Sequence, residues 1–247
     1  MTVQTIFELL QQKAPLELAE EWDNVGLLVG DQAAEVTTVV VALDVTEAVL
    51  NCAIEEHAQL IVTHHPVIFD GLKVVTADTF VHRLAKAGLS VISMHTNADK
   101  AEGGVNDCLC EKLGLSDIKV APDGMSRIGN LPASMTAEVF ASYVSQCLDT
   151  AVRVKAGSDM IRTVALCGGA GADLVLPLLD TVDAALTGEV KHHEWLLVPS
   201  AKTLVDGGHY ATEVAITERF CEWLHDVFPT LNVVLYKGEA PYSTIEG

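Results

Sequence analysis

The sequence predicts an α/β protein of two lobes, each with a mostly parallel sheet. Short β-branched runs alternate with helical patterns along the chain, which is typical of βαβ units. The length of 247 residues suffices for two lobes with substantial cores. A stretch with two prolines and two glycines at 121–134 divides two segments that show the same alternation of strands and helices. We therefore expect a first lobe at 1–124 and a second at 125–247, whose C-terminal strand is a candidate to return to the first lobe.

The first lobe begins with a helical pattern at 3–14 that stops before Pro15. The run TTVVVAL at 37–43 predicts a buried strand, and Thr46 is placed to cap the helix that follows. Further strands are expected at 60–65 and 89–94. Further helices are expected at 80–87 and 105–113, which end at Gly88 and Gly114.

The second lobe repeats this alternation. Its expected elements are a helix at 136–148, a strand at 161–167, a tight loop at 168–171, a strand at 183–189, a long helix at 209–228 and a last strand at 231–236. Each lobe also contains a strand that runs into a histidine followed four residues later by an acid, His95 with Asp99 and His209 with Glu213. We hypothesise that the lobes are diverged copies; chance recurrence of short words is the alternative.

The charge balance narrows the function. With 34 acidic against 15 basic side chains, the formal net charge is −19, and no run of Lys or Arg offsets it. Such a chain repels a phosphate backbone, which argues against nucleic acid as a partner. No apolar stretch reaches the roughly 18 residues of a membrane-spanning helix, so we expect no membrane association and a cytoplasmic location. The six cysteines lack paired spacing and are expected to be buried and reduced.

Two adjacent histidines carry the first chemical signal. His64 and His65 follow a predicted strand and precede Pro66, so they lie at its carboxyl end, where ligand sites of open α/β sheets gather. Neighbouring strand residues point to opposite faces, so each histidine could serve one of two metal ions. Taken alone, the pair could equally be two ordinary surface histidines.

Further donors lie at comparable positions. Asp99 follows the third strand and is expected at the same sheet edge, and His209 and Glu213 share one face of the predicted long helix. Three imidazoles and two carboxylates form a mixed set suited to Zn, Fe, Mn or Co. A dinuclear centre of this kind can activate water near neutral pH, and hydrolysis is then the natural chemistry.

Other signals are weaker. The GGAG loop at 168–171 could bind an anion but lacks the Walker lysine, and a tight turn explains it as well. Glu189 and His193 belong to a second acidic and imidazole-rich patch, which could also be a solvated helix end. Trp22, Asp23 and Asn24 could support a polar pocket or form a turn.

Five sequence motifs, in their order along the chain, resemble those of the Nif-three-like family, whose bacterial members are also called GTP cyclohydrolase I type 2 homologs. They are EWDNVGLLVGD, VTHHPVIF, HTNADKAEGGVNDCL, TGEVKHHE and DGGHYATE. The resemblance runs from about Glu21 to the C-terminal helix and is closest to the short form of the family, without an inserted middle domain.

The resemblance implies two α/β lobes with a dinuclear metal centre in a cleft between them, and a homo-oligomer in the form of a toroidal hexamer. By motif match, two divalent ions per chain would be held by His64, His65, Asp99, His209 and Glu213. His95 is left as a proton-transfer candidate, and Glu189 and His193 are the other catalytic candidates.

Two functions stay open. The first is a metal-dependent hydrolase that uses metal-activated water on a small molecule such as a nucleotide, as the GTP cyclohydrolase name implies. Only Lys73, Lys100 and Arg127 are basic candidates to hold a triphosphate. The alternative is a non-catalytic metal-binding protein that acts as a metal chaperone, an insertase or a regulatory partner.

Overall fold

The computed structural model describes residues 1–242 of the chain, which divides into two compact units. Unit 1 contains Met1–Gly104 and Ile216–Gly238, and unit 2 contains Val105–Ala215 and the segment after Gly238. The chain therefore first passes from unit 1 to unit 2 after Gly104, earlier than the expected boundary at 124. The reason is that Leu109, Cys110 and Leu113 pack into a core of unit 2.

Unit 1 is built on a mostly parallel sheet with the strand order β1-β4-β3-β2-β11. Its elements are α1 (Val3–Lys13), η1 (Leu16–Leu18), β1 (Gly26–Val29), β2 (Thr38–Ala42), α2 (Glu47–Glu55), β3 (Leu60–Thr63), α3 (Phe80–Lys86), β4 (Ser90–Ser93), α4 (Thr96–Lys100), α10 (Ala215–Val227) and β11 (Asn232–Leu235). The pairings of β11 with β2, β2 with β3 and β3 with β4 are parallel, and β1 runs antiparallel to β4. The C-terminal strand thus lies in the sheet of unit 1.

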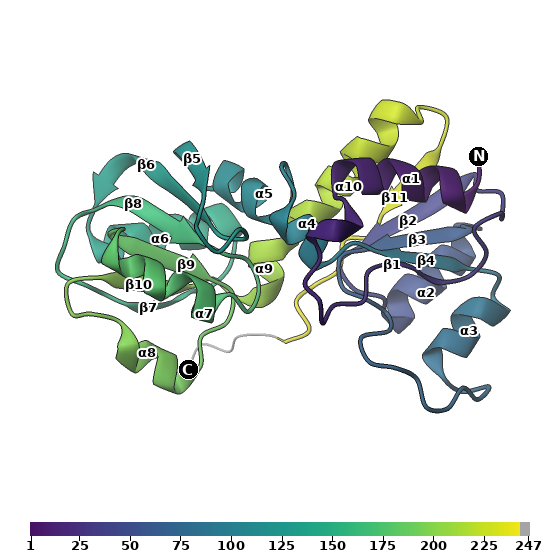
Figure 1. Cartoon of the computed structure of the whole chain (residues 1–247), viewed down its shortest axis with the longest axis horizontal. Helices are drawn as coiled ribbons and strands as arrows, with labels where there is room; N and C mark the ends of the chain where they lie inside the picture. Colours follow the sequence, from purple (N-terminus) through teal and green to yellow (C-terminus); the bar gives the residue numbers. More distant parts are fainter. Residues whose placement is uncertain (243–247) are drawn as a thin grey trace. The chain divides into compact units, whose positions relative to one another are not determined.

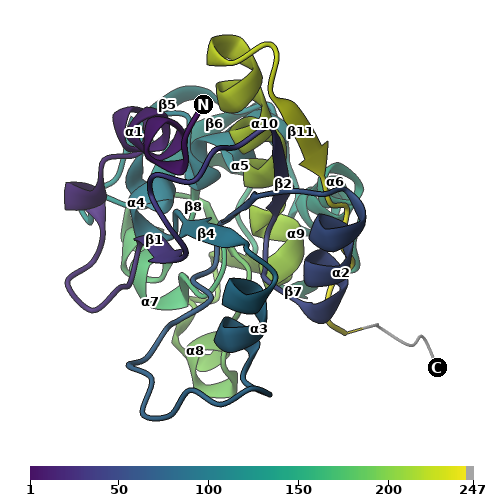
Figure 2. The same cartoon turned by 90° about the vertical axis from the view of Figure 1, so that its right-hand side faces the viewer.

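Helices cover both faces of this sheet, which is why its central strands are buried throughout. Figure 1 shows α1 and α10 on one face and α2 and α3 on the other, and the turned view in Figure 2 agrees. Every residue of β2 and of β3 is buried. Alternate side chains point to opposite faces, so Val40 and Ile61 join the core formed with Val49, Leu50 and Leu84.

Unit 2 has a mixed sheet with the order β5-β6-β8-β9-β10-β7. Its elements are α5 (Val105–Lys112), β5 (Ser116–Val120), β6 (Arg127–Met135), α6 (Ala137–Leu148), β7 (Arg153–Lys155), β8 (Ile161–Leu166), α7 (Ala172–Val175), η2 (Pro177–Asp180), β9 (Ala184–Thr187), α8 (His192–Leu197), β10 (Thr203–Asp206) and α9 (His209–Glu213). The pairings of β8 with β9 and of β9 with β10 are parallel. The pairings of β5 with β6, β6 with β8 and β7 with β10 are antiparallel.

The mostly parallel prediction is therefore right for unit 1 and wrong for the outer strands of unit 2. The stretch 121–134, interpreted as a boundary because of its prolines and glycines, mostly enters β6. Gly124 supplies the left-handed backbone of the turn between β5 and β6, with a φ of 78°. Pro132 lies in β6 where the register with β8 shifts, so its missing N–H is tolerated.

The predicted long helix at 209–228 is two helices. The first, α9, ends at Glu213, Val214 lies in a turn, and α10 begins at Ala215. The break separates the units, since α9 belongs to unit 2 and nearly all of α10 to unit 1. The apolar stripe of α10 is buried as expected at Phe220, Trp223 and Leu224.

The two sheets share a four-strand unit with the same order and directions. In unit 1 it is β1-β4-β3-β2, and in unit 2 it is β7-β10-β9-β8. In each, the three later strands are parallel and the first strand in sequence runs antiparallel to the last. The last strand leads into a short helix, α4 or α9. This shared topology supports the hypothesis of diverged copies.

Unit 2 contains an ion pair whose arginine is buried. Arg127 is 2% exposed, and its Nε donates to Oδ1 of Asp107 at 2.5 Å while Nη1 donates to the Met125 carbonyl at 2.7 Å. These bonds connect β6 to α5.

None of the helices described within residues 1–242 has the length and apolar character needed to span a bilayer.

Replacing Asp107 by Ala should destabilise the protein, because the buried guanidinium of Arg127 would lose its compensating charge. Breaking a buried pair typically costs about 3 kcal/mol of the free energy of unfolding, which urea denaturation can measure. The control is Glu47→Ala, which removes the exposed partner of Arg83 and should change stability little. Equal losses in the two variants would contradict this assignment.

Candidate metal centre

The carboxyl ends of β3 and β4 bring three histidines together in unit 1. Thr63 and Ser93 are register partners in the two parallel strands, so the residues after them leave the sheet at one edge. His64 and His65 follow β3, and His95 precedes α4. The ring centroids of His64 and His65 lie 4.9 Å apart, and that of His95 lies 5.1 Å from His64. The structure confirms that these strand ends gather imidazoles.

His64 is completely buried and has a defined orientation. Its Nδ1 lies 2.9 Å from the carbonyl oxygen of Met94. A carbonyl oxygen can only accept, so Nδ1 is the donor, and in the neutral imidazole Nε2 carries the lone pair. Nε2 lies 3.6 Å from Oδ1 of Asp99 on α4. Two residues predicted as metal ligands, His64 and Asp99, therefore lie side by side. The ring nitrogen and the carboxylate oxygen that could bind a metal face each other.

His65 and His95 are held in the same way by carboxylates. Nδ1 of His65 lies 2.6 Å from Oδ1 of Asp44, and Nδ1 of His95 lies 2.9 Å from Oδ1 of Asp23. An ionised carboxylate only accepts, so each Nε2 again keeps its lone pair when the imidazole is neutral. The three histidines thus present the same ring nitrogen.

Asp23 is the most strongly fixed of these carboxylates. Its side chain is fully buried and also accepts from the backbone N–H and the hydroxyl of Thr96, at 3.0 and 2.5 Å. Burial alone would raise the pKa of Asp23, but the hydrogen bonds from His95 and Thr96 outweigh it and hold the pKa well below its usual range. Asp23 is therefore an ionised anchor for the His95 ring.

Sequence reasoning missed the roles of Asp44 and Asp23. Asp44 comes directly after the strand predicted at 37–43, so the rule that selected His64 could have selected it too. Asp23 was noted only as a residue able to support a pocket. Its partner His95 lies 72 positions away, and no local pattern records that pairing.

Unit 2 contains a set of donors of its own at the end of β10. His209 and Glu213 lie one helical turn apart on α9, with Nε2 of His209 3.0 Å from Oε2 of Glu213. Nδ1 of His209 lies 3.0 Å from Oε1 of Glu189. The structure thus brings together the two ligands predicted in this unit, and Glu189 holds His209 as Asp44 holds His65.

The GGAG loop closes tightly around Glu213. A Cβ on Gly169, which has a φ of 58°, would lie 2.1 Å from Oε1 of Glu213 and 3.2 Å from Nε2 of His209. The N–H of Gly169 donates to the hydroxyl of Thr212 at 3.1 Å, and that of Gly171 donates to Thr187, also at 3.1 Å. The loop is a packed turn whose glycines leave room for the donors of α9.

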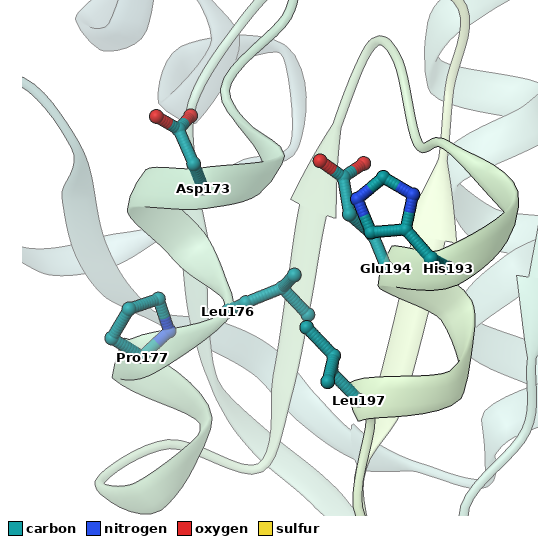
Figure 3. A pocket seen from close by; sticks show the side chains of 6 residues that line it. All are labelled: Asp173, Leu176, Pro177, His193, Glu194 and Leu197. Carbon is teal, nitrogen blue, oxygen red and sulfur yellow. The ribbon is translucent and has the colours of Figure 1, made fainter.

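His193 lies elsewhere in unit 2. Figure 3 shows it on α8, facing a pocket of about 390 Å³. The lining residues are Asp173, Leu176, Pro177, His193, Glu194 and Leu197. None of the others is a predicted metal ligand, so the structure gives His193 different neighbours from those of Glu189.

The donor chemistry of unit 1 suits a divalent transition metal. One ring nitrogen from each of His64, His65 and His95 lies within 4.8 Å of the others. Histidine ligands characteristically donate the second ring N–H to a carboxylate or backbone carbonyl, which fixes the tautomer. Met94, Asp44 and Asp23 supply those acceptors. Nitrogen and carboxylate oxygen donors together fit Zn, Fe, Mn or Co.

Fold and site define a class: an α/β protein in which strand ends carry a candidate histidine and carboxylate metal centre. Residues 1–241 match the family described as Duf34/NIF3 (NGG1p interacting factor 3). The chain belongs to this family, which confirms the resemblance seen in the sequence.

Similar proteins share nearly the whole chain. A GTP cyclohydrolase 1 type 2 homolog of Campylobacter jejuni is 31% identical over 249 residues, which cover 98% of this chain and 99% of the relative. The homolog of Lactococcus lactis is 36% identical over 79% of this chain and 81% of its own.

Solved structures agree in fold. A Staphylococcus aureus hypothetical protein superposes with a TM-score of 0.90 at 27% identity, covering 99% of both chains. Reduced HcgD from Methanocaldococcus jannaschii gives a TM-score of 0.82 at 29% identity, covering 95% of this chain and 97% of HcgD.

Replacing Gly169 by Ala should displace the Glu213 carboxylate. Because we propose Glu213 as a metal ligand, the substitution should also lower zinc affinity. The physical reason is the 2.1 Å approach of a Cβ to Oε1. Isothermal titration with zinc measures the effect. Gly124→Ala is the matched control, because Gly124 also has a positive φ but no atom within 4 Å of its Cβ position. Similar affinities for the two variants would refute the packing argument.

Proposed function

We propose that the chain is a metal-binding protein whose ligands are His64, His65, Asp99, His209 and Glu213. The observation that carries this proposal is that an oxygen acceptor holds Nδ1 of His64 and of His65 and leaves Nε2 as the metal-binding atom. His209 has a carboxylate oxygen 3.0 Å from each of its ring nitrogens. Such acceptors fix the orientation and the tautomer of the ring, which is typical of imidazoles that bind metal. Two divalent ions per chain and the hexamer stay predictions from the family resemblance.

We further propose that the bound metal serves hydrolysis of a small molecule. A divalent ion would lower the pKa of a bound water and polarise the group under attack. The relatives named GTP cyclohydrolase 1 type 2 homolog suggest a nucleotide-like substrate.

The protein's own contribution to this reaction would centre on His95. Asp23 orients its ring and leaves Nε2 able to accept a proton. Glu189, a catalytic candidate from sequence, contacts Nδ1 of His209 and is better described as a positioning residue. His193 lines the pocket beside α8, and the proposed mechanism does not use it.

The basic residues argue against recognition through a triphosphate. Arg127 is buried against Asp107, and Nζ of Lys100 pairs with Oε1 of Glu20 at 2.7 Å. Lys73 alone of the three basic candidates is exposed without a described ion pair. With a net charge of −19, this observation keeps the non-catalytic metal carrier as the second candidate.

Asp99→Ala and Glu213→Ala should each lower the metal bound per chain severalfold, because each removes a charged ligand. His95→Gln should abolish turnover of GTP by the metal-loaded protein while leaving most of the metal bound. Elemental analysis and a product assay measure the two effects on the same samples.

The matched controls are Glu8→Ala and His82→Gln, which change an acid and a histidine outside the site. Full metal occupancy in both carboxylate variants would refute the ligand assignment. A metal-loaded wild-type protein that turns over no nucleotide would reject the hydrolase and favour the carrier.

A further inference from the structure

Two large aromatic side chains of unit 1 are exposed beside His95. Trp22 is 60% exposed and Phe69 is 55% exposed. Single exposed apolar residues are common, but two aromatics in contact with each other and with a polar site are not explained by the fold. Other large aromatic side chains of unit 1 are buried, as Phe220 and Trp223 of α10 show.

The two rings and the imidazole form one cluster. The ring centroids of Trp22 and Phe69 lie 5.9 Å apart, and those of Trp22 and Phe69 lie 6.1 and 6.3 Å from that of His95. Both aromatics meet the imidazole edge to face, at interplanar angles of 74° and 70°. Their remaining faces are available to a second planar group.

Hydrogen bonds hold the two loops that carry these rings. Nδ2 of Asn24 donates to the carbonyl of Ile68 at 2.6 Å, which ties the residues beside Trp22 to those beside Phe69. Asp23, between Trp22 and Asn24, is anchored on His95 and Thr96. The rings are thus arranged before any ligand arrives, which lowers the entropic cost of binding.

We propose that Trp22 and Phe69 form a stacking subsite for a planar heteroaromatic ring, such as a purine, of the molecule that meets His95. This inference rests on the proposed function of the same site and names its substrate class. Because Lys100 and Arg127 are already paired, Lys73 is the one of the three basic candidates left for a phosphate chain, and the ring supplies most of the recognition. A nucleoside should therefore bind about as well as its triphosphate.

The test is calorimetric titration of the zinc-loaded full chain with guanosine, and with ribose 5-phosphate as a probe without a base. Stacking on an aromatic side chain is worth about 1–3 kcal/mol per base, so Trp22→Ala and Phe69→Ala should each weaken guanosine binding by about 5- to 150-fold. Trp22→Phe, which keeps an aromatic face, should restore most of the affinity. Ribose 5-phosphate should bind far more weakly than guanosine.

Leu72→Ala is the matched control, since Leu72 is 51% exposed near Phe69 in sequence. An equal loss of guanosine binding in Leu72→Ala, or none in the aromatic variants, would overturn the subsite. So would a change in oligomeric mass of both aromatic variants by light scattering with unchanged guanosine affinity, because the pair would then be a protein contact.

Metal content and turnover, measured on the same variants, separate the two proposals. Guanosine binding that depends on Trp22 and Phe69 without any turnover would support the subsite and reject the hydrolase. Turnover of a substrate without an aromatic ring, unchanged in both aromatic variants, would support the hydrolase and reject the subsite.

Discussion

The hydrogen bond from imidazole Nδ1 to a fixed oxygen is the interaction on which the candidate centre depends. It occurs at His64, His65, His95 and His209, with a backbone carbonyl as acceptor in the first case and a carboxylate in the others. An imidazole free to rotate or change tautomer would present either nitrogen. Here the acceptors select Nε2 at His64, His65 and His95, whereas His209 has a carboxylate oxygen 3.0 Å from each ring nitrogen.

The repeated topology explains why this arrangement arises twice. In both units a parallel strand triplet ends in a short helix that carries an acid one turn inside it. Asp99 in α4 and Glu213 in α9 each lie four residues after a histidine of the same unit. The histidines differ, since His95 precedes its helix while His209 begins its own.

The sequence predicted what depends on local pattern. The buried strands at β2, β3 and β8 follow from β-branched runs, and the position of His64 and His65 follows from the end of β3. The antiparallel strands β5 and β6 were missed because exposed residues and turn signals dominate that stretch. The break at Val214 was missed because the helical spacing of Glu213, Ile216 and Phe220 continues across it.

Long-range pairing accounts for most of what sequence could not predict at the site. The contacts of Asp23 with His95 and of Asn24 with Ile68 join positions far apart in the chain. The burial of Arg127 reverses its interpretation, because an arginine that appears available to bind phosphate in the sequence is neutralised by Asp107 in the structure. Such reversals depend on packing, which no local pattern contains.

The most direct test of the centre is anomalous diffraction at the zinc edge from crystals of the zinc-loaded protein. The account predicts anomalous peaks about 2.0–2.1 Å from Nε2 of His64, of His65 and of His209. Peaks at the Nδ1 atoms of these residues, or zinc bound only away from them, would contradict it.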